Sequence, residues 1–301
     1  MLAEQRYKHG LMFAFSAYIM WGIAPLYFKA LGDIGAVDIL LHRVVWSFAF
    51  VLIVIALMRG FSNIKQLFAQ RKKILLLAVT SVIIAFNWLL FIWAINNDRM
   101  LDASLGYYIN PLFNILLGTV FLAEKLRRLQ WAAVALAAIA VLVELISFGS
   151  IPWVSLALAS SFGIYGLLRK KINIDALSGL FVETLFLLPV ALAYLWLIDH
   201  SSIELLMSDL TYSLLLVAAG VVTTLPLLAF SAAAIRIPLS TLGFIQYIGP
   251  SLMLLLAVFV YGEAFSMEKA ITFGFIWLAL IVYSYDGLMN HRRKKQALSA
   301  G

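Results

Sequence analysis

The chain contains no cysteine among its 301 residues, and only 12% of the residues are charged. The absence of cysteine excludes disulfide frameworks, thiolate metal sites and cysteine nucleophiles. The shortage of charge excludes an ordinary soluble domain, in which about a quarter of the residues are charged. Hydrophobic residues instead make up 64% of the chain, and its mean hydropathy is +1.00. These values predict an integral membrane protein.

Long apolar stretches fill almost the whole chain. A membrane-spanning helix needs about 20 predominantly apolar residues. Such stretches occur at residues 10–31, 37–58, 74–96, 102–123, 129–148, 152–168, 176–198, 211–234, 239–261 and 268–288. No connecting segment is long enough to hold a soluble domain, and the short alternating segments of a membrane β-barrel are absent. We therefore predict an all-α integral membrane protein with ten transmembrane helices.

The basic residues predict which way the chain crosses the membrane. If the N-terminus is cytoplasmic, eighteen lysines and arginines fall on cytoplasmic segments and three on outer loops. This bias follows the positive-inside rule, so we predict that both termini are cytoplasmic. The formal charge of +7 also invites a nucleic-acid partner. We interpret residues 291–301 instead as a basic cytoplasmic tail beside anionic lipid, and predict no nucleic-acid partner.

One phrase occurs twice in the chain. Residues 108–124 read YINPLFNILLGTVFLAE and residues 247–263 read YIGPSLMLLLAVFVYGE, so both run from Tyr-Ile-X-Pro to a glutamate, at an offset of 139. The copies fall in the fourth span of two sets of five, residues 1–148 and residues 149–290. Because five is odd, the second set must enter the membrane from the opposite side. The sequence therefore predicts two inverted five-helix repeats.

A shorter match in the same order supports the duplication. Trp21-Gly22 in the first span is matched by Tyr165-Gly166 in the sixth. Inverted repeats are the architecture of alternating access, in which two equivalent halves exchange conformations around a site between them. The repeat therefore predicts a carrier that moves a small molecule through the bilayer.

Three motifs give the chain a resemblance to a known family. They are HRVVWS at 42–47, YYINPL at 107–112 and FIQYIGP at 244–250. Together with the two five-span halves they resemble the EamA branch of the drug/metabolite transporter superfamily, and within it the RarD type, the chloramphenicol-sensitive proteins. The resemblance implies a carrier in the bacterial inner membrane that exports small metabolites or drugs. It does not specify the substrate.

Two repeated prolines mark the predicted path of the solute. Pro111 and Pro250 bend their helices and free backbone carbonyls, which need partners or a wet cavity. Polar side chains share their helical face, so we predict a substrate cavity with aromatic walls and amide groups, suited to a small amphipathic or aromatic solute. Its predicted residues are Tyr18, Trp21, Arg43, Asn87, Tyr107, Asn110, Asn114, Gln246 and Tyr247. The alternative is that the prolines only shape packing and that the aromatic rings face lipid.

Ionisable side chains inside the spans are costly, about 2.5–3.5 kcal/mol each at the bilayer centre. Arg43 and Glu183 occupy corresponding places in the two halves, 140 residues apart, and Glu144 lies at about the depth of Arg43. We predict that Arg43 forms a gate or a contact with a substrate carboxylate, balanced by Glu144. We predict that Glu183 is a coupling carboxylate for protons, whose change to glutamine abolishes coupled transport without loss of folding. The alternative is that all three form buried pairs that hold helices together.

Two further glutamates end the repeated phrases. A negative charge at the end of a helix opposes the local helix dipole. We therefore predict that Glu124 and Glu263 accept hydrogen bonds from the start of the following helix, which is a structural role.

Other function classes find less support in the residues. An intramembrane enzyme needs a nucleophile with a base or a set of metal ligands, but the chain has no HExxH or GxSxG motif and a single histidine, His42, within a span. We predict no catalytic residues, no metal and no cofactor. A membrane scaffold or receptor would have no wet cavity between the halves, and a channel would show no counterflow. The sequence leaves the oligomeric state open.

Overall fold

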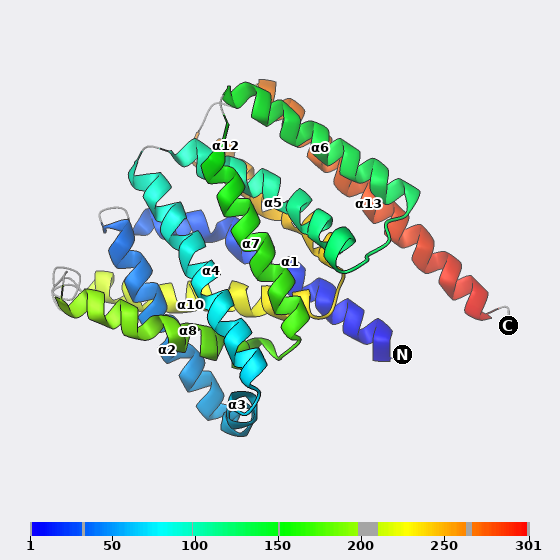
Figure 1. Ribbon diagram of the computed structural model, residues 1–301. Coiled ribbons are helices and arrows are strands. Elements are labelled where there is room, and N and C mark those ends of the chain that lie inside the picture. Colours follow the sequence, from blue (N-terminus) through cyan, green and yellow to red (C-terminus); the bar gives the residue numbers. More distant parts are fainter. Residues whose placement is uncertain are drawn as a thin grey trace.

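The computed structural model describes residues 2–31, 34–97, 99–149, 151–197, 210–262 and 267–299. This part of the chain contains helices and no strand, which confirms the all-α prediction. The helices are α1 Leu2–Ala30, α2 Ala36–Leu57, α3 Phe61–Phe68, α4 Arg71–Asn96, α5 Met100–Phe121, α6 Arg128–Phe148, α7 Trp153–Ile172, α8 Ala176–Leu197, α10 Leu210–Ala234, α11 Leu239–Gln246, α12 Ile248–Phe259 and α13 Met267–Ser299 (Figure 1).

Within the described residues, eight helical stretches are long and apolar enough to cross a membrane. The predicted spans at 102–123 and 152–168 are outside this set, and they correspond to α5 and α7, of 22 and 20 residues. At about 1.5 Å per residue both helices match a hydrocarbon core of about 30 Å. Their polar side chains, such as Asn110, Asn114 and Ser161, make them less apolar than the others. The total of ten transmembrane helices therefore stays a prediction.

The ninth predicted span, 239–261, is broken into α11 and α12 at Tyr247. Pro250 has no N–H to donate to the carbonyl of Gln246, and Gly249 is a poor helix former, so the helical hydrogen bonds are interrupted here. In the first copy of the phrase asparagine stands in place of this glycine, and α5 continues unbroken through its own proline. The two copies of the phrase therefore differ in backbone conformation.

A short helix, α3, lies between α2 and α4, where the sequence analysis predicts only a connecting segment. It has one apolar face, and Ile64 and Leu67 on that face are buried. The helix is too short to be recognised from apolar periodicity over a window of 11 to 18 residues.

The helices pack mainly across the two predicted halves. α1 packs on α10 and α12, while α4 packs on α7 and α8. α2 contacts both α8 and α10, and α5 contacts both α7 and α11. Both chain termini lie on the same side of the bundle in Figure 1, and we call that side the terminal end.

α6 and α13 lie side by side along one edge of the bundle (Figure 1). The contact uses the alanine-rich face of α6, where Ala133, Ala137 and Ala140 are fully buried against Ile276 and Ala279 of α13. Small side chains allow two membrane helices to approach closely. The alanine face therefore packs within one chain.

Gly22 of α1 and Gly163 of α7 make similar close contacts with other helices. A Cβ atom on Gly22 would lie 2.8 Å from Leu252 of α12, and a Cβ atom on Gly163 would lie 2.8 Å from Phe113 of α5. Leu252 and Phe113 are themselves 139 residues apart, so these two glycines make corresponding contacts. Gly163, three residues before Gly166, is thus the glycine of the sixth span whose contact resembles that of Gly22, and the match of Trp21-Gly22 with residues 165–166 stays a prediction.

The contact between α2 and α10 depends on Gly220. A Cβ atom there would lie 2.4 Å from the carbonyl carbon of Trp46, which is closer than real contacts allow. We expect Gly220→Ala to lower the free energy of unfolding by about 1–3 kcal/mol, measured by denaturation in mixed micelles. Gly274→Ala in α13 is the control, because a Cβ there meets nothing within 4 Å and alanine favours a helix. Equal stability of the two variants would contradict this close approach.

Candidate functional site

A buried polar network joins the predicted halves near the middle of the helices. Asn114 Nδ2 donates to Asn110 Oδ1 at 3.1 Å and to Gln246 Oε1 at 2.8 Å. The Tyr18 hydroxyl donates to the same Gln246 oxygen at 3.4 Å. Asn110 Nδ2 donates to the carbonyl of Ala159 at 2.7 Å. The network therefore connects α1 and α5 of the first half to α7 and α11 of the second.

The side chains of this network are almost completely buried. Tyr18, Asn110, Asn114 and Gln246 each expose 6% of their surface or less. Asn114 Oδ1 is buried and has no hydrogen-bond partner within the described residues. In this conformation the four side chains are hydrogen-bonded to one another or to a neighbouring helix, and their place in the wall of a substrate cavity stays a prediction.

The remaining predicted cavity residues are distributed around this network. Trp21 packs in an aromatic cluster with Tyr18, Phe162 and Phe230. Asn87 is partly buried and donates to the Leu158 carbonyl and the Ser161 hydroxyl, both at 2.9 Å. Tyr247 is fully buried, and its hydroxyl donates to the Tyr108 carbonyl at 3.3 Å. Tyr107 alone among the predicted aromatic residues is substantially exposed, at 39%.

The two prolines of the repeated phrase lie inside helices, as predicted. Pro111 is in the middle of α5 and Pro250 in the first turn of α12, and both are buried. α11 passes close to α5 here, since a Cβ atom on Gly243 would lie 2.6 Å from the Pro111 carbonyl oxygen. Pro111 therefore lies where α5 and α11 are in close contact.

Arg43 projects from α2 into a group of aromatic side chains. Its Nε donates to Thr223 Oγ1 on α10 at 2.8 Å. The guanidinium carbon lies 5.1 Å from the ring centroid of Trp88 and 5.6 Å from that of Phe28, distances at which cation–π attraction operates. The Arg43 side chain is partly exposed.

The predicted pairing of Arg43 with Glu144 does not form. Among the described residues Arg43 makes no ion pair, and Glu144 lies on α6, which packs on α13 and α5 rather than on α2. Glu144 is partly exposed and interacts electrostatically with Tyr108. Equal depth along two helices gives a common height, but it does not place the helices side by side.

Glu183 instead pairs with Arg169 of α7. Arg169 Nη1 lies 3.6 Å from Glu183 Oε1, and both side chains are 2% exposed. Thr80 Oγ1 donates to Glu183 Oε1 at 2.6 Å and the Tyr165 hydroxyl donates to Oε2 at 3.1 Å. Ser231 accepts from Arg169 Nε at 3.2 Å. The carboxylate is thus satisfied by one cation and two hydroxyl groups, which come from α4 and α7.

The sequence analysis missed Arg169 because it heads the basic run Arg169, Lys170 and Lys171, which fits a cytoplasmic loop. A second signal was available in Gly179 of α8. A Cβ atom at Gly179 would lie 1.8 Å from Arg169 Nη1, so the glycine leaves the space that the guanidinium fills. A glycine one turn before an intramembrane glutamate is the pattern that indicates this arrangement.

Glu124 closes a contact between the halves at the terminal end. Its carboxylate accepts hydrogen bonds from the backbone N–H of Leu239 at 2.6 Å and of Ser240 at 2.9 Å, and from the Ser240 hydroxyl at 2.7 Å. Lys170 Nζ of α7 lies 3.9 Å from the same carboxylate and donates to the carbonyls of Ala234 and Ile237. We call Glu124, Lys170, Leu239 and Ser240 the terminal clasp.

Glu124 accepts hydrogen bonds at the start of a helix, as predicted, but the helix is not the one that was predicted. The side chain caps the start of a helix, where unpaired N–H groups and the helix dipole favour a negative charge. That helix is α11, 115 residues later, and not the following helix α6. The backbone at Ala123 has a positive φ of 52°, which turns the chain away from the axis of α5 just before Glu124. Glu263 lies outside the described residues.

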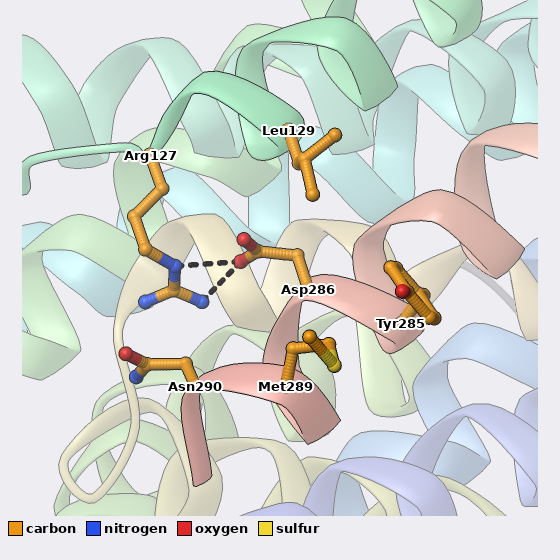
Figure 2. A pocket seen from close by; sticks show the side chains of 6 residues that line it. All are labelled: Arg127, Leu129, Tyr285, Asp286, Met289 and Asn290. Atoms are coloured by element: carbon orange, nitrogen blue, oxygen red, sulfur yellow. Dashed lines mark hydrogen bonds and ion pairs between the residues drawn. The ribbon is translucent and has the colours of Figure 1, made fainter. Parts of the chain in front are cut away.

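A separate pocket lies between α6 and α13 at the terminal end. It is lined by Arg127, Leu129, Tyr285, Asp286, Met289 and Asn290 (Figure 2). Arg127 Nε donates to Asp286 Oδ2 at 2.6 Å, and a second guanidinium nitrogen contacts the same oxygen. This hydrogen bond raises the pKa of Arg127 above its usual value. None of the residues that line the pocket belongs to the polar network, and we interpret its ion pair as a link between α13 and the start of α6.

Comparisons with known proteins agree with this architecture. Residues 8–146, almost the whole first predicted half, match the EamA-like transporter family. An "Uncharacterized transporter" of Vibrio cholerae serotype O1 is 60% identical over 286 residues, which are 95% of each chain. "Protein RarD" of Escherichia coli K12 is 53% identical and covers 95% of this chain and 97% of its own.

More distant relatives extend the comparison. "Chloramphenicol-sensitive protein RarD" of Pseudomonas aeruginosa is 34% identical over 92% of this chain and 94% of its own. A solved crystal structure superposes with a TM-score of 0.69 at 18% identity, and it covers 92% of this chain and 98% of that chain. At this identity the similarity shows a common fold.

Proposed function

Because the chain belongs to the EamA-like transporter family, in its RarD-type branch, we propose that it is a secondary-active exporter that works by alternating access. Membership makes it a membrane transporter of the drug/metabolite kind, which acts on a small molecule within a lipid bilayer, and the names of its relatives indicate a transporter rather than an enzyme. Direction, mechanism and coupling ion are the parts that we propose.

The exchange of contacts between the halves carries the proposal. If residues 1–148 and 149–290 are inverted repeats, swapping the halves should turn the main contacts between helices into one another. The pair α1 and α10 becomes α7 and α4, and the pair α2 and α10 becomes α8 and α4, and all four pairs are in contact. Such equivalence supports ten transmembrane helices in two inverted sets, because each half can then adopt the conformation of the other.

The contacts at the terminal end support the proposal that this conformation is closed there. There the terminal clasp joins α5 to α7 and α11, and every residue of α11 is buried. Towards the opposite end Tyr107 is 39% exposed and Arg43 remains partly exposed. With both termini in the cytoplasm of a bacterial cell and the helices in its inner membrane, as the basic residues favour, this state would face outward.

Glu183 is the residue that we propose for proton coupling. Its carboxylate is fully buried and balances the charge of Arg169. Protonation would leave the arginine as an uncompensated charge in a low-dielectric interior, which is strongly unfavourable. The cluster around Glu183 therefore supports a switch in which binding of a proton favours a rearrangement of α7 against α8. The alternative that the pair serves packing alone predicts transport without pH dependence.

A metabolite comparison tests the proposed function. We expect cells that produce the wild-type protein to release at least one small solute faster than cells with an empty vector or with the Arg43→Ala variant. Purified protein in liposomes should then exchange that solute by counterflow, which distinguishes a carrier from a channel. If no solute changes between the three strains, export is excluded, and a scaffold or receptor becomes the better interpretation.

A further inference from the structure

The protein orients the guanidinium group of Arg43, but the described residues do not neutralise its charge. Thr223 occupies Nε at 2.8 Å, and this is the one hydrogen bond that the described residues give the guanidinium. The rings of Trp88 and Phe28 flank it at 5.1 and 5.6 Å. The two terminal nitrogens, which form the planar fork that binds carboxylates in pairs of hydrogen bonds, therefore have no acceptor among the described residues.

Comparison with Glu183 shows what is absent at Arg43. Both residues lie at corresponding places in the predicted halves, Arg43 on α2 and Glu183 on α8. Each bonds a threonine on the third long helix of the other half, Thr223 on α10 and Thr80 on α4. Glu183 receives its opposite charge from Arg169, a residue of α7. The corresponding helix α1 presents to Arg43 the ring of Phe28 instead of a carboxylate.

The two sites also differ in access. Glu183 and Arg169 are each 2% exposed, so their pair is sealed within the protein. Arg43 stays partly exposed although side chains from α1, α4 and α10 surround it. Tyr27 and Tyr107 are near enough to interact electrostatically with it, and Tyr107 is itself 39% exposed. Arg43 is therefore the more accessible of the two charged side chains.

We propose that Arg43 binds the carboxylate of the transported molecule, which makes the substrate a small monoanion with an aromatic or apolar body. This inference rests on the proposed transport function and specifies its substrate class. One guanidinium compensates one negative charge inside the membrane, so a single carboxylate fits better than a phosphate dianion. The rings of Trp88, Phe28 and Tyr107 provide apolar surface for the rest of the molecule.

Matched acids and amides test the proposal by binding. The probes are N-acetyl-phenylalanine, phenylacetate and hexanoate, each paired with its uncharged amide, and the measurement is the melting temperature of the full-length detergent-solubilised protein at increasing probe concentration. We expect at least one acid to stabilise the wild-type protein while its amide does not. Arg43→Gln should weaken the binding of that acid by about tenfold or more, because two charge-assisted hydrogen bonds are lost.

Two further variants make the result specific. Arg43→Lys keeps the charge but loses the planar fork, so we expect intermediate affinity, and it replaces Arg43→Gln if that variant is too unstable to purify. Arg99→Gln is the matched control, since Arg99 also lies over two rings, those of Trp93 and Trp153. It should bind the acid as the wild type does. Equal stabilisation by acids and amides, unchanged affinity in the Arg43 variants, or the same loss in Arg99→Gln would overturn the proposal.

Counterflow in liposomes separates this proposal from the proposed function. If the acid binds through Arg43 but no solute is exchanged, transport is excluded and the carboxylate site stands. If acids and amides are exchanged equally, and Arg43→Gln exchanges both at the wild-type rate, the protein is a carrier and the carboxylate site is excluded.

Discussion

Glu183→Gln is expected to lower the free energy of unfolding by about 3–5 kcal/mol, because it leaves Arg169 as an unpaired charge in the interior. Both side chains are 2% exposed, so water cannot replace the lost carboxylate. Thr80 and Tyr165, which donate to Glu183, would also face an amide with a single acceptor oxygen. Denaturation in mixed micelles measures the effect. The sequence-based expectation that this variant folds normally is therefore replaced by one of large destabilisation.

The double variant Glu183→Gln with Arg169→Gln isolates the cause. Removing both charges should recover most of the lost stability, since an uncharged pair has no desolvation cost to offset. Glu144→Gln is the control for loss of a membrane carboxylate that has no ion pair among the described residues. If Glu183→Gln alone is as stable as the wild type, the ion pair does not contribute to folding.

The same variants test proton coupling. The double variant is expected to fold. It should no longer accumulate solute in liposomes in response to a pH gradient, because the proposed proton site is gone. A double variant that still accumulates solute in response to the gradient would exclude Glu183 as the coupling carboxylate. Stability and coupling are thus measured on the same protein.

The helical class and the positions of most helices could be predicted because hydrophobicity is a local property. Every apolar stretch of about 20 residues contains its own signal, and the phrase from Tyr108 to Glu124 made the duplication visible. The short α3 and the break at Tyr247 were missed. The first depends on the packing of a helix of eight residues and the second on the combined effect of Gly249 and Pro250, and a hydropathy window averages both signals away.

The partners of the polar side chains could not be predicted, since they depend on which helices are neighbours. Arg43 and Glu144 were compared by their predicted depth, but α2 and α6 are not packed together, so the pair does not form. Arg169 was assigned to a loop because it starts a basic run, although its side chain turns back to reach Glu183. Composition indicates which charges lie near a membrane, but contacts decide which of them are buried.

Replacing Glu124 with alanine is expected to open the terminal end of the bundle. The carboxylate accepts three hydrogen bonds from Leu239 and Ser240, and hydrogen bonds to a charged group contribute about 1.5–3 kcal/mol each. Without it, Lys170 also loses its nearest carboxylate. If the protein alternates between two conformations, this loss shifts the population away from the state closed at the terminal end.

Cysteine labelling measures this shift directly, because the natural chain has no cysteine. Leu239→Cys places a thiol at a fully buried position of the terminal clasp. We expect this thiol to react with a maleimide at least about tenfold faster once Glu124 is alanine, because a loss of about 1.4 kcal/mol corresponds to a factor of ten in population. Ala133→Cys, fully buried between α6 and α13, is the control for general unfolding and should stay unreactive in both backgrounds. Glu124→Gln keeps one acceptor oxygen and should fall between. The clasp joins the end of α5 to α11, so faster labelling at Leu239 alone would mean that the two halves separate at this end while each remains folded, as alternating access requires. Equal labelling with and without Glu124 would mean that the clasp does not hold this end closed.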